Sequence, residues 1–222
     1  MEIKNIQTFG WDNAIKGMRY SFNSEKRSDS IFQALHDENG ISIIPYLGNE
    51  DFKLMKRLVK AGGEHRKFLR AIHVQMSINA TMTFWKQFDT YKIATTTLSR
   101  STMHTLMKEP LSIEVNFDSF NNSEVLKDIV NYINELIYNY NEEAEKPSNN
   151  PDEMERLFFE TIDILPMSYL QERMVDLNYE NILNIIKQRK GHKLKHEWKK
   201  LCEELLETLP YLKDFYDALK EK

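Results

Sequence analysis

A stretch of hydroxyl and cationic side chains, residues 88–104, has the clearest capacity for chemistry. It reads FDTYKIATTTLSRSTMH and combines seven serine and threonine hydroxyls with Lys92, Arg100 and His104. Hydroxyls donate neutral hydrogen bonds to phosphate oxygens, and cations donate stronger, charge-assisted ones. The same composition also suits a loop covered by water. The sequence leaves both interpretations open: a solvated loop, or a site for a phosphate-bearing ligand.

A second charged segment, GGEHRKFLR at residues 62–70, follows a predicted helix. Its glycine turn leads an acid, His65 and cations including Arg70 into a predicted strand. Side chains at the mouth of a strand often contact ligands. A turn held together by ordinary salt bridges accounts for the same residues equally well.

A third polar segment, residues 165–193, surrounds the start of a predicted helix. Asn178 and Arg189 are eleven positions apart, which is about three helical turns along one face. Groups of this kind orient a base edge and a phosphate, although a helix with surface cations has the same pattern. Further polar side chains precede this helix: Gln171, Glu172 and Arg173.

Several familiar chemistries lack support. Seven glycines leave no glycine-rich phosphate loop, and one cysteine allows neither a paired zinc motif nor an internal disulfide. That cysteine, Cys202, lies in a helical pattern and is expected to be a buried, inert thiol. His192 and His196 share a predicted helix face, with Glu197 beside them, but no third ligand follows by spacing. We therefore predict no metal site.

Composition bounds the class of protein. The 222 residues are 41% hydrophobic, enough for one sizeable core, so we expect a single domain over 1–222. No run approaches the roughly 18 apolar residues of a membrane span, and the N-terminus lacks signal-peptide features, which predicts a cytoplasmic protein. A net charge of −4 argues against long nucleic acid as a partner. A small anionic ligand in one pocket fits this charge better.

The elements that must position these groups are mostly helices. Apolar spacing and capping residues predict a helix-rich α/β (α+β) chain with a small central sheet. Residues 111–117 fit either a strand or an irregular segment, and residues 23–30 fit a loop. We predict a strand or its approach at 1–9 and a strand at 67–78. We predict helices at 11–22, 49–61, 80–92, 122–146, 152–163, 178–190 and 194–219, the last interrupted at Pro210.

Together the three polar segments resemble the flavin-dependent thymidylate synthases, from about residue 11 to residue 215. That family carries a Glu-His step before its first long strand, then a helix ending in Arg-His-Arg followed by Ala-Ser. Later it carries Leu-Pro, an Asn thirteen residues on, and an Arg eleven residues after that. The matching positions here are Glu64-His65, the segment QFDTYKIATTTLS, Leu165-Pro166, Asn178 and Arg189.

The departures from this pattern fall in the hydroxyl-rich stretch. Thr90, Tyr91 and Lys92 stand where the family has Arg-His-Arg, and the downstream Arg-Tyr of the family is absent, although Leu98 and Ser99 remain. Two guanidinium forks are replaced by one ammonium, which acts as a point charge without bidentate geometry. In the segments GMR…SDS, EH.KFLR, FDTYK and STMH the chain is similar to divergent relatives encoded by bacteriophages.

The resemblance implies a thymidylate synthase-like scaffold, a homotetramer with pockets at subunit boundaries, and FAD as a cofactor candidate. Our leading hypothesis is a nucleotide-binding protein that has lost the signature arginines and sequesters a host nucleotide signal, an anti-defence role. The alternative is an active FAD-dependent enzyme that methylates or modifies a deoxyuridine nucleotide. A structural or interaction protein with a vestigial pocket is the third hypothesis. Whether any reaction is catalysed stays open, and no residue is assigned as catalytic.

The ligand-binding hypothesis assigns a role to each candidate. Arg189 and Lys92 would contact phosphate, Asn178 a base or ring edge, and Tyr91 would stack. The remaining candidates fall into three groups: Ser99, Arg100 and Ser101 on the anion's other face; His65 and Arg70 at the mouth; and Arg19, Ser28 and Ser30 from the N-terminal loop, with Arg173 as a weaker candidate.

Overall fold

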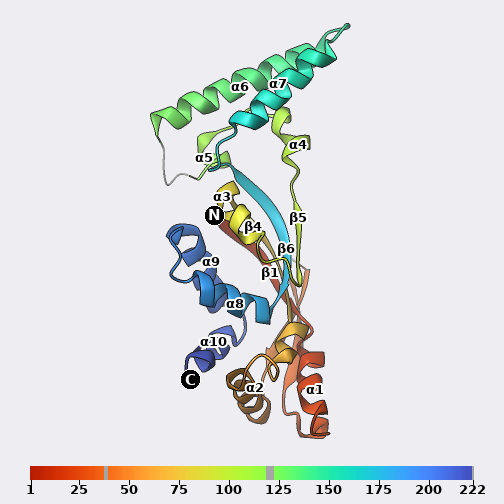
Figure 1. Cartoon of the computed structure of the whole chain (residues 1–222). Helices are drawn as coiled ribbons and strands as arrows, with labels where there is room; N and C mark the ends of the chain where they lie inside the picture. The colour runs from red at the N-terminus through yellow and green to blue at the C-terminus, as the bar shows by residue number, and fades with distance from the viewer. Residues whose placement is uncertain (38–39, 119–122, 222) are drawn as a thin grey trace. The chain divides into compact units, whose positions relative to one another are not determined.

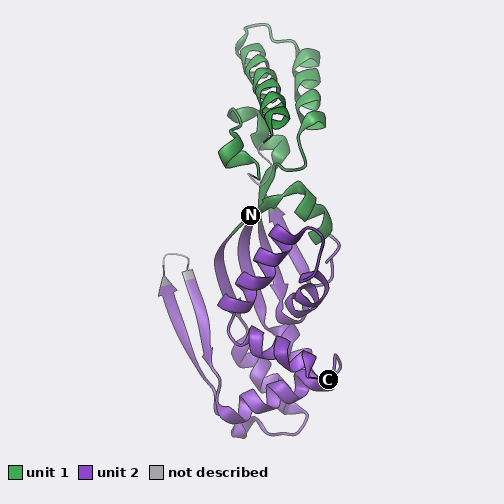
Figure 2. Ribbon diagram, turned by 90° about the vertical axis from the view of Figure 1, so that its left-hand side faces the viewer, with its two compact units in different colours: residues 1–2, 79–89, 99–173 green, residues 3–78, 90–98, 174–222 purple. Residues whose placement is uncertain are grey.

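The computed structural model describes residues 1–37, 40–118 and 123–221. The chain divides into two compact units (Figure 2). Unit 1 contains residues 1–2, 79–89 and 99–173, and unit 2 contains residues 3–78, 90–98 and 174–222. Since the chain passes between the units several times, neither unit is one continuous stretch of sequence. The expectation of a single domain over 1–222 stays a prediction.

A four-stranded sheet has the strand order β1-β4-β6-β5 (Figure 1). Its best-defined strand, β4, alternates strictly: Val74, Met76, Ile78 and Ala80 are buried, as period-two side-chain alternation requires. The predicted start at residue 67 was wrong, because residues 67–71 form a 3-10 turn before the strand begins. The strands are β1 (Glu2–Phe9), β4 (His73–Thr81), β5 (Thr95–Ser99) and β6 (Leu170–Asn178).

The helices of unit 2 largely match the predicted ranges. Gly10, before the first helix, has φ of 83°, and a Cβ there would meet Ala71 O at 2.2 Å, so this position requires glycine. Gly62 ends the next helix at φ of 115°. These helices are α1 (Trp11–Tyr20), α2 (Asn49–Ala61), α8 (Tyr179–Arg189), α9 (Lys195–Thr208) and α10 (Leu212–Lys220), with 3-10 turns η1 (Glu25–Arg27) and η2 (Lys67–Ala71).

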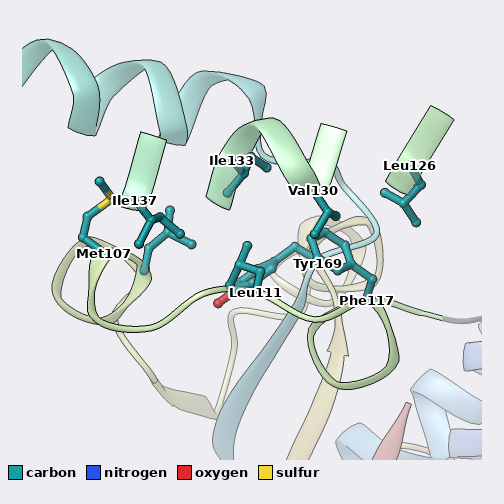
Figure 3. Close-up of a cluster of buried hydrophobic side chains, with 9 residues drawn as sticks. Met107, Leu111, Phe117, Leu126, Val130, Ile133, Ile137 and Tyr169 are labelled. Carbon is teal, nitrogen blue, oxygen red and sulfur yellow. The ribbon is translucent and has the colours of Figure 1, made fainter. Parts of the chain in front are cut away.

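Unit 1 is dominated by two long helices, α6 (Glu124–Glu145) and α7 (Pro151–Ile164), which lie side by side (Figure 1). Pro151 occupies the first turn of α7, where its missing N–H costs nothing, and Asn150 caps that turn. The apolar stripe of α6 packs into a cluster with Phe117 and Tyr169 (Figure 3). The shorter elements are α3 (Met82–Phe88), α4 (Thr102–Thr105), η3 (Leu106–Lys108) and α5 (Ile113–Asn116).

An antiparallel hairpin of β2 (Ile31–Asp37) and β3 (Gly40–Tyr46) belongs to unit 2 and was not predicted (Figure 2). Its register pairs Ile31 with Tyr46, and both of these side chains are exposed. The usual signal of a half-buried strand, apolar residues on one face only, is therefore weak here. The Thr8 hydroxyl donates to Ile43 O at 3.2 Å and ties the hairpin to β1.

Three further segments differ from their predictions. Residues 111–117 contain the short helix α5, followed by a single bridge between Phe117 and Tyr169, so they are neither a strand nor wholly irregular. The helix predicted over 80–92 ends at Phe88. The polar residues before Tyr179 form strand β6 instead of surrounding a helix start. In the part of the chain that the structure describes, no helix has the length and apolarity of a membrane span.

Candidate functional site

The hydroxyl-rich stretch is neither a loop throughout nor all in one unit. Residues 90–98 belong to unit 2 and residues 99–101 to unit 1. A left-handed turn at Ala94, φ of 51°, leads into β5. Asn181 on α8 holds this turn, because its Nδ2 donates to Ile93 O at 2.6 Å and to Thr95 Oγ1 at 3.1 Å. The fold thus fixes the first part of the stretch against α8.

Asn178, the candidate for a base edge, caps the helix that carries Arg189. It is 3% exposed, and its Oδ1 accepts from the N–H of Asn181 at 3.0 Å, the standard N-cap bond. This cap explains its position without any ligand. A base contact by Asn178 stays a prediction.

Arg189 and Tyr91, two of the predicted residues, are brought together at the end of α8. Arg189 Nε donates to Tyr91 Oη at 2.7 Å, and Tyr91 Oη donates to Gln188 Oε1 at 3.0 Å. The guanidinium carbon lies 5.4 Å from the Tyr91 ring centre and 4.8 Å from that of Trp198, both within cation–π range. The groups that hold the guanidinium in place, a tyrosine and a tryptophan, therefore carry no charge.

The remaining donors of this guanidinium are available. Arg189 is half-buried, and no carboxylate among the described residues forms an ion pair with it. Within the same described residues, neither Nη1 nor Nη2 of Arg189 donates to a protein acceptor. A planar fork of this kind matches a phosphate or carboxylate through two parallel bonds. The arrangement can therefore hold an anion without breaking an existing ion pair.

His192, which the sequence placed only on a predicted helix face with His196, lies near this guanidinium. Its Nδ1 accepts from Leu194 N–H at 3.1 Å, and its ring centre lies 6.2 Å from that of Trp198. Burial lowers the pKa of His192, and the positive charges of Arg189 and Lys193 lower it further. The lowered pKa favours the neutral form of His192, and the charge of Arg189 is one of its causes.

Three further candidates in unit 2 are not held in place as Arg189 is. Lys92, His65 and Arg70 are exposed, and their side chains make no hydrogen bond to other described residues. The ordered cation of this turn is Arg66, whose Nε and Nη2 both reach the Glu180 carboxylate at 2.9 Å. With a second pair between Lys67 and Glu64, this segment forms a salt-bridged turn.

The candidates in unit 1 are engaged with their own unit. Arg100 pairs with Glu172 at 2.7 Å, and Arg173 stacks over Trp85 at 4.4 Å while donating to Asp89 at 2.9 Å. Ser99 is exposed at the end of β5, and Ser101 caps α4 through its carbonyl. Arg173 therefore has a structural role, and ligand contacts by Ser99, Arg100 and Ser101 stay predictions.

The N-terminal candidates surround a residue that the sequence did not single out, Asp51. Arg19 Nε donates to Asp51 Oδ1 at 2.6 Å, and the hydroxyls of Ser28 and Ser30 donate to Oδ2 at 2.8 and 2.6 Å. Burial alone would raise the pKa of Asp51, but bonds from Ser30, Ser28 and Arg19 and the charge of Arg19 outweigh it and lower the pKa. Both serines and the Arg19 Nε thus order the loop around a buried carboxylate.

The lone cysteine behaves as expected. Cys202 is buried in α9, and burial raises the pKa of its thiol to about 11. A thiol of this pKa stays protonated at pH 7 and is a poor nucleophile.

Solved structures of similar fold place this helix-rich α+β architecture in one class, the flavin-dependent thymidylate synthase fold, as predicted. Two of them are crystal structures of ThyX from Helicobacter pylori in complex with FAD and dUMP. One has a TM-score of 0.69 and 18% identity, covering 99% of this chain and 100% of that one. The other has a TM-score of 0.71 and 18% identity, with full coverage of both chains. No protein-family model and no curated protein sequence matches this chain.

Proposed function

We propose that this protein binds a small phosphate-bearing nucleotide and that Arg189 is its principal phosphate contact. The observation that carries the proposal is the guanidinium held by Tyr91 and Trp198, with its two terminal nitrogens unused by the described protein groups. An arginine that only stabilised the fold would be expected to pair with a carboxylate, as Arg66 does with Glu180.

The chemistry of the ligand follows from this geometry and from the fold. A fork of two parallel N–H donors matches two oxygens of one phosphate group, which favours a phosphate over a single-point anion such as chloride. The ThyX structures of the same fold contain dUMP, a nucleoside monophosphate. Lys92, exposed four residues after α3 ends, supplies a second cation of the same unit. We therefore propose a nucleoside monophosphate as the first ligand to test.

A second candidate function is that of an FAD-dependent enzyme, because both ThyX structures contain FAD. The residues present do not fit the flavin grip that the resemblance implies. Of Thr90, Tyr91 and Lys92 only the lysine is cationic, and the Tyr91 hydroxyl is already bonded to Arg189 and Gln188. We therefore place no reaction step on a flavin. Purified protein that turns yellow and retains FAD through gel filtration would favour this second candidate.

The finer biological role rests on the resemblance to phage-encoded relatives. We propose that a bound nucleotide is held without turnover, as sequestration of a host nucleotide signal requires, and that the protein acts in the cytoplasm as a homotetramer. Native mass spectrometry of protein purified from its host cells tests both parts, since it reports bound small molecules and subunit number together.

Calorimetric titration with dUMP tests the central proposal. Wild-type protein is expected to bind dUMP, and Arg189→Gln to weaken binding at least about tenfold, because a charge-assisted fork is worth more than about 1.4 kcal/mol. Lys187→Gln is the matched control, since Lys187 is an exposed cation two residues earlier on α8. Equal affinities of the Arg189→Gln and wild-type proteins, or no binding by the wild type, would refute the proposal.

A further inference from the structure

A cavity of about 670 Å³ in unit 2 lies among α1, the turn η1 and α2. It shares no residue with the Arg189 site. Four of its eight lining residues are cationic and one is acidic. The lining residues are Arg19, Phe22, Ser24, Arg27, Glu50, Lys53, Leu54 and Arg57.

Two of the four cations at the cavity have no carboxylate partner. Arg27 and Arg57 are exposed, and neither guanidinium makes a hydrogen bond or ion pair with any residue that the structure describes. Lys53 lies 3.9 Å from Glu50, its neighbour one turn away on α2, a distance at which the pair is weak. Like charges gathered at one concavity repel each other, and an anion bound among them relieves this repulsion.

The buried member of the group, Arg19, has an unused donor. It is 4% exposed, and its Nη2 is buried without a hydrogen-bond partner in the described structure. A buried charged donor without a partner is unfavourable, and native proteins usually supply one.

Asp51 does not supply that partner. Its Oδ1 accepts from Arg19 Nε, and its Oδ2 accepts from the hydroxyls of Ser28 and Ser30 and from the backbone N–H groups of Asp29 and Ser30. None of these bonds comes from Arg19 Nη2. Arg19 also lines the cavity, where a bound anion would give this donor a partner.

The cavity also has an aromatic side chain on its lining. Phe22 is 73% exposed, so its ring is open to a ligand at the cavity. An exposed ring beside a group of cations is the pairing that binds a nucleoside, whose base stacks while its phosphates meet the cations. A volume of about 670 Å³ is within the range of small-molecule sites and exceeds what a single phosphate needs.

We propose that this cavity is a second anion-binding site, which takes the diphosphate of a phosphorylated small molecule. Arg19 Nη2, Arg27 and Arg57 bind the phosphate oxygens, and Phe22 packs against the organic part. Arg19 is held by Asp51 before the ligand arrives, while Arg27 and Arg57 close on it. The site is independent of the nucleotide site proposed at Arg189.

Calorimetric titration with inorganic pyrophosphate and with ADP tests this proposal. The double variant Arg27→Gln/Arg57→Gln removes two exposed charges without touching Asp51, so it is expected to fold, which its melting curve checks. It should weaken pyrophosphate binding at the cavity at least tenfold. Lys56→Gln, a change on α2 that does not touch the cavity lining, should leave binding unchanged. Unchanged pyrophosphate affinity in the folded double variant would overturn the proposal.

Two further arms separate the parts of the proposal. Arg189→Gln should lose dUMP binding and keep the pyrophosphate site that needs Arg27 and Arg57, whereas loss of all pyrophosphate binding in Arg189→Gln would overturn the second site. Phe22→Ala should weaken ADP binding several-fold and leave pyrophosphate unaffected. Equal effects of Phe22→Ala on the two ligands would overturn the role of the ring.

Discussion

An arginine lies at each end of helix α8, one held by a carboxylate and the other by neutral groups. At its first turn, Glu180 holds Arg66 by a bidentate ion pair whose side chains are 9% and 15% exposed. At its last turn, Arg189 is held by the Tyr91 hydroxyl and the ring of Trp198, which are neutral. The Glu180 carboxylate offsets the charge of Arg66 and occupies its Nε and Nη2 donors, so this guanidinium has little to offer a ligand. One oriented by neutral groups keeps its charge, so the same helix stabilises the fold at one end and can bind an anion at the other.

The buried pair of Arg19 and Asp51 is the extreme case of a carboxylate-held arginine. Asp51→Asn is expected to cost about 3–5 kcal/mol of the free energy of unfolding, because it leaves the Arg19 charge buried and uncompensated. Urea unfolding at pH 7 measures this loss. A loss below 1 kcal/mol would show that the pair is not a stabilising feature.

The pair of Arg19 and Asp51 should also make the stability of the protein depend on pH. The pKa of Asp51 in the folded protein is lowered below its ordinary value of 3.8, so its contribution to stability is fully present above that value and is lost as the pH falls through the folded pKa. Wild-type stability should therefore fall below about pH 4, and the Asp51→Asn protein should show a shallower decline. Parallel pH profiles for the two proteins would contradict the assignment.

Loss of the ion pair between Glu180 and Arg66, at the first turn of α8, should cause the next largest loss of stability. Glu180→Gln should cost about 3 kcal/mol, at the lower end for a buried pair because Arg66 is partly exposed. Glu203→Gln on α9 is the control: its pair with Lys199 is 3.8 Å long and exposed, and its loss should change stability little. Similar destabilisation by the two changes would remove the contrast between buried and exposed pairs.

Removal of the Tyr91 hydroxyl, the neutral group that holds Arg189, should have a smaller effect than the loss of either buried ion pair. Tyr91→Phe removes the acceptor of Arg189 Nε and keeps the ring, so dUMP affinity should fall about threefold to tenfold, the value of one hydrogen bond. Tyr138→Phe, at an exposed tyrosine of α6, is the matched control in the same calorimetric titration. If Tyr91→Phe binds dUMP as the wild type does, the hydroxyl does not position the guanidinium for the ligand.

The long helices could be predicted from the sequence because their signals are local, and the scaffold followed from the resemblance to the flavin-dependent thymidylate synthases. The stripe of α6, the Pro151 start of α7 and the Gly62 stop of α2 each depend on residues within a few turns. The strand β5 could not, since its side chains are mostly exposed and no alternation marks it. The hairpin of β2 and β3 was not predicted for the same reason, because many of its large apolar side chains are exposed.

The sequence predicted some of the residues of the site, but not the contacts between them. Arg189 and Tyr91 were both candidates, but their hydrogen bond joins residues 98 positions apart, a distance over which one sequence gives no pairing. Asp51 was missed because an acid in the first turn of a helix is ordinarily a solvated residue that favours the helix dipole. Trp198 and Asn181 were missed because helical periodicity assigns them only to a helix, and their partners follow only from the tertiary fold.

The pKa of His192, measured by NMR titration with and without saturating dUMP, tests the central claim most directly. Burial and then the charge of Arg189 lower the pKa of this histidine, and a phosphate bound to Arg189 would cancel that charge. We predict that dUMP raises the pKa of His192 in the wild-type protein and leaves it unchanged in Arg189→Gln. A pKa that does not move when dUMP is bound to the wild-type protein would contradict a phosphate site at Arg189.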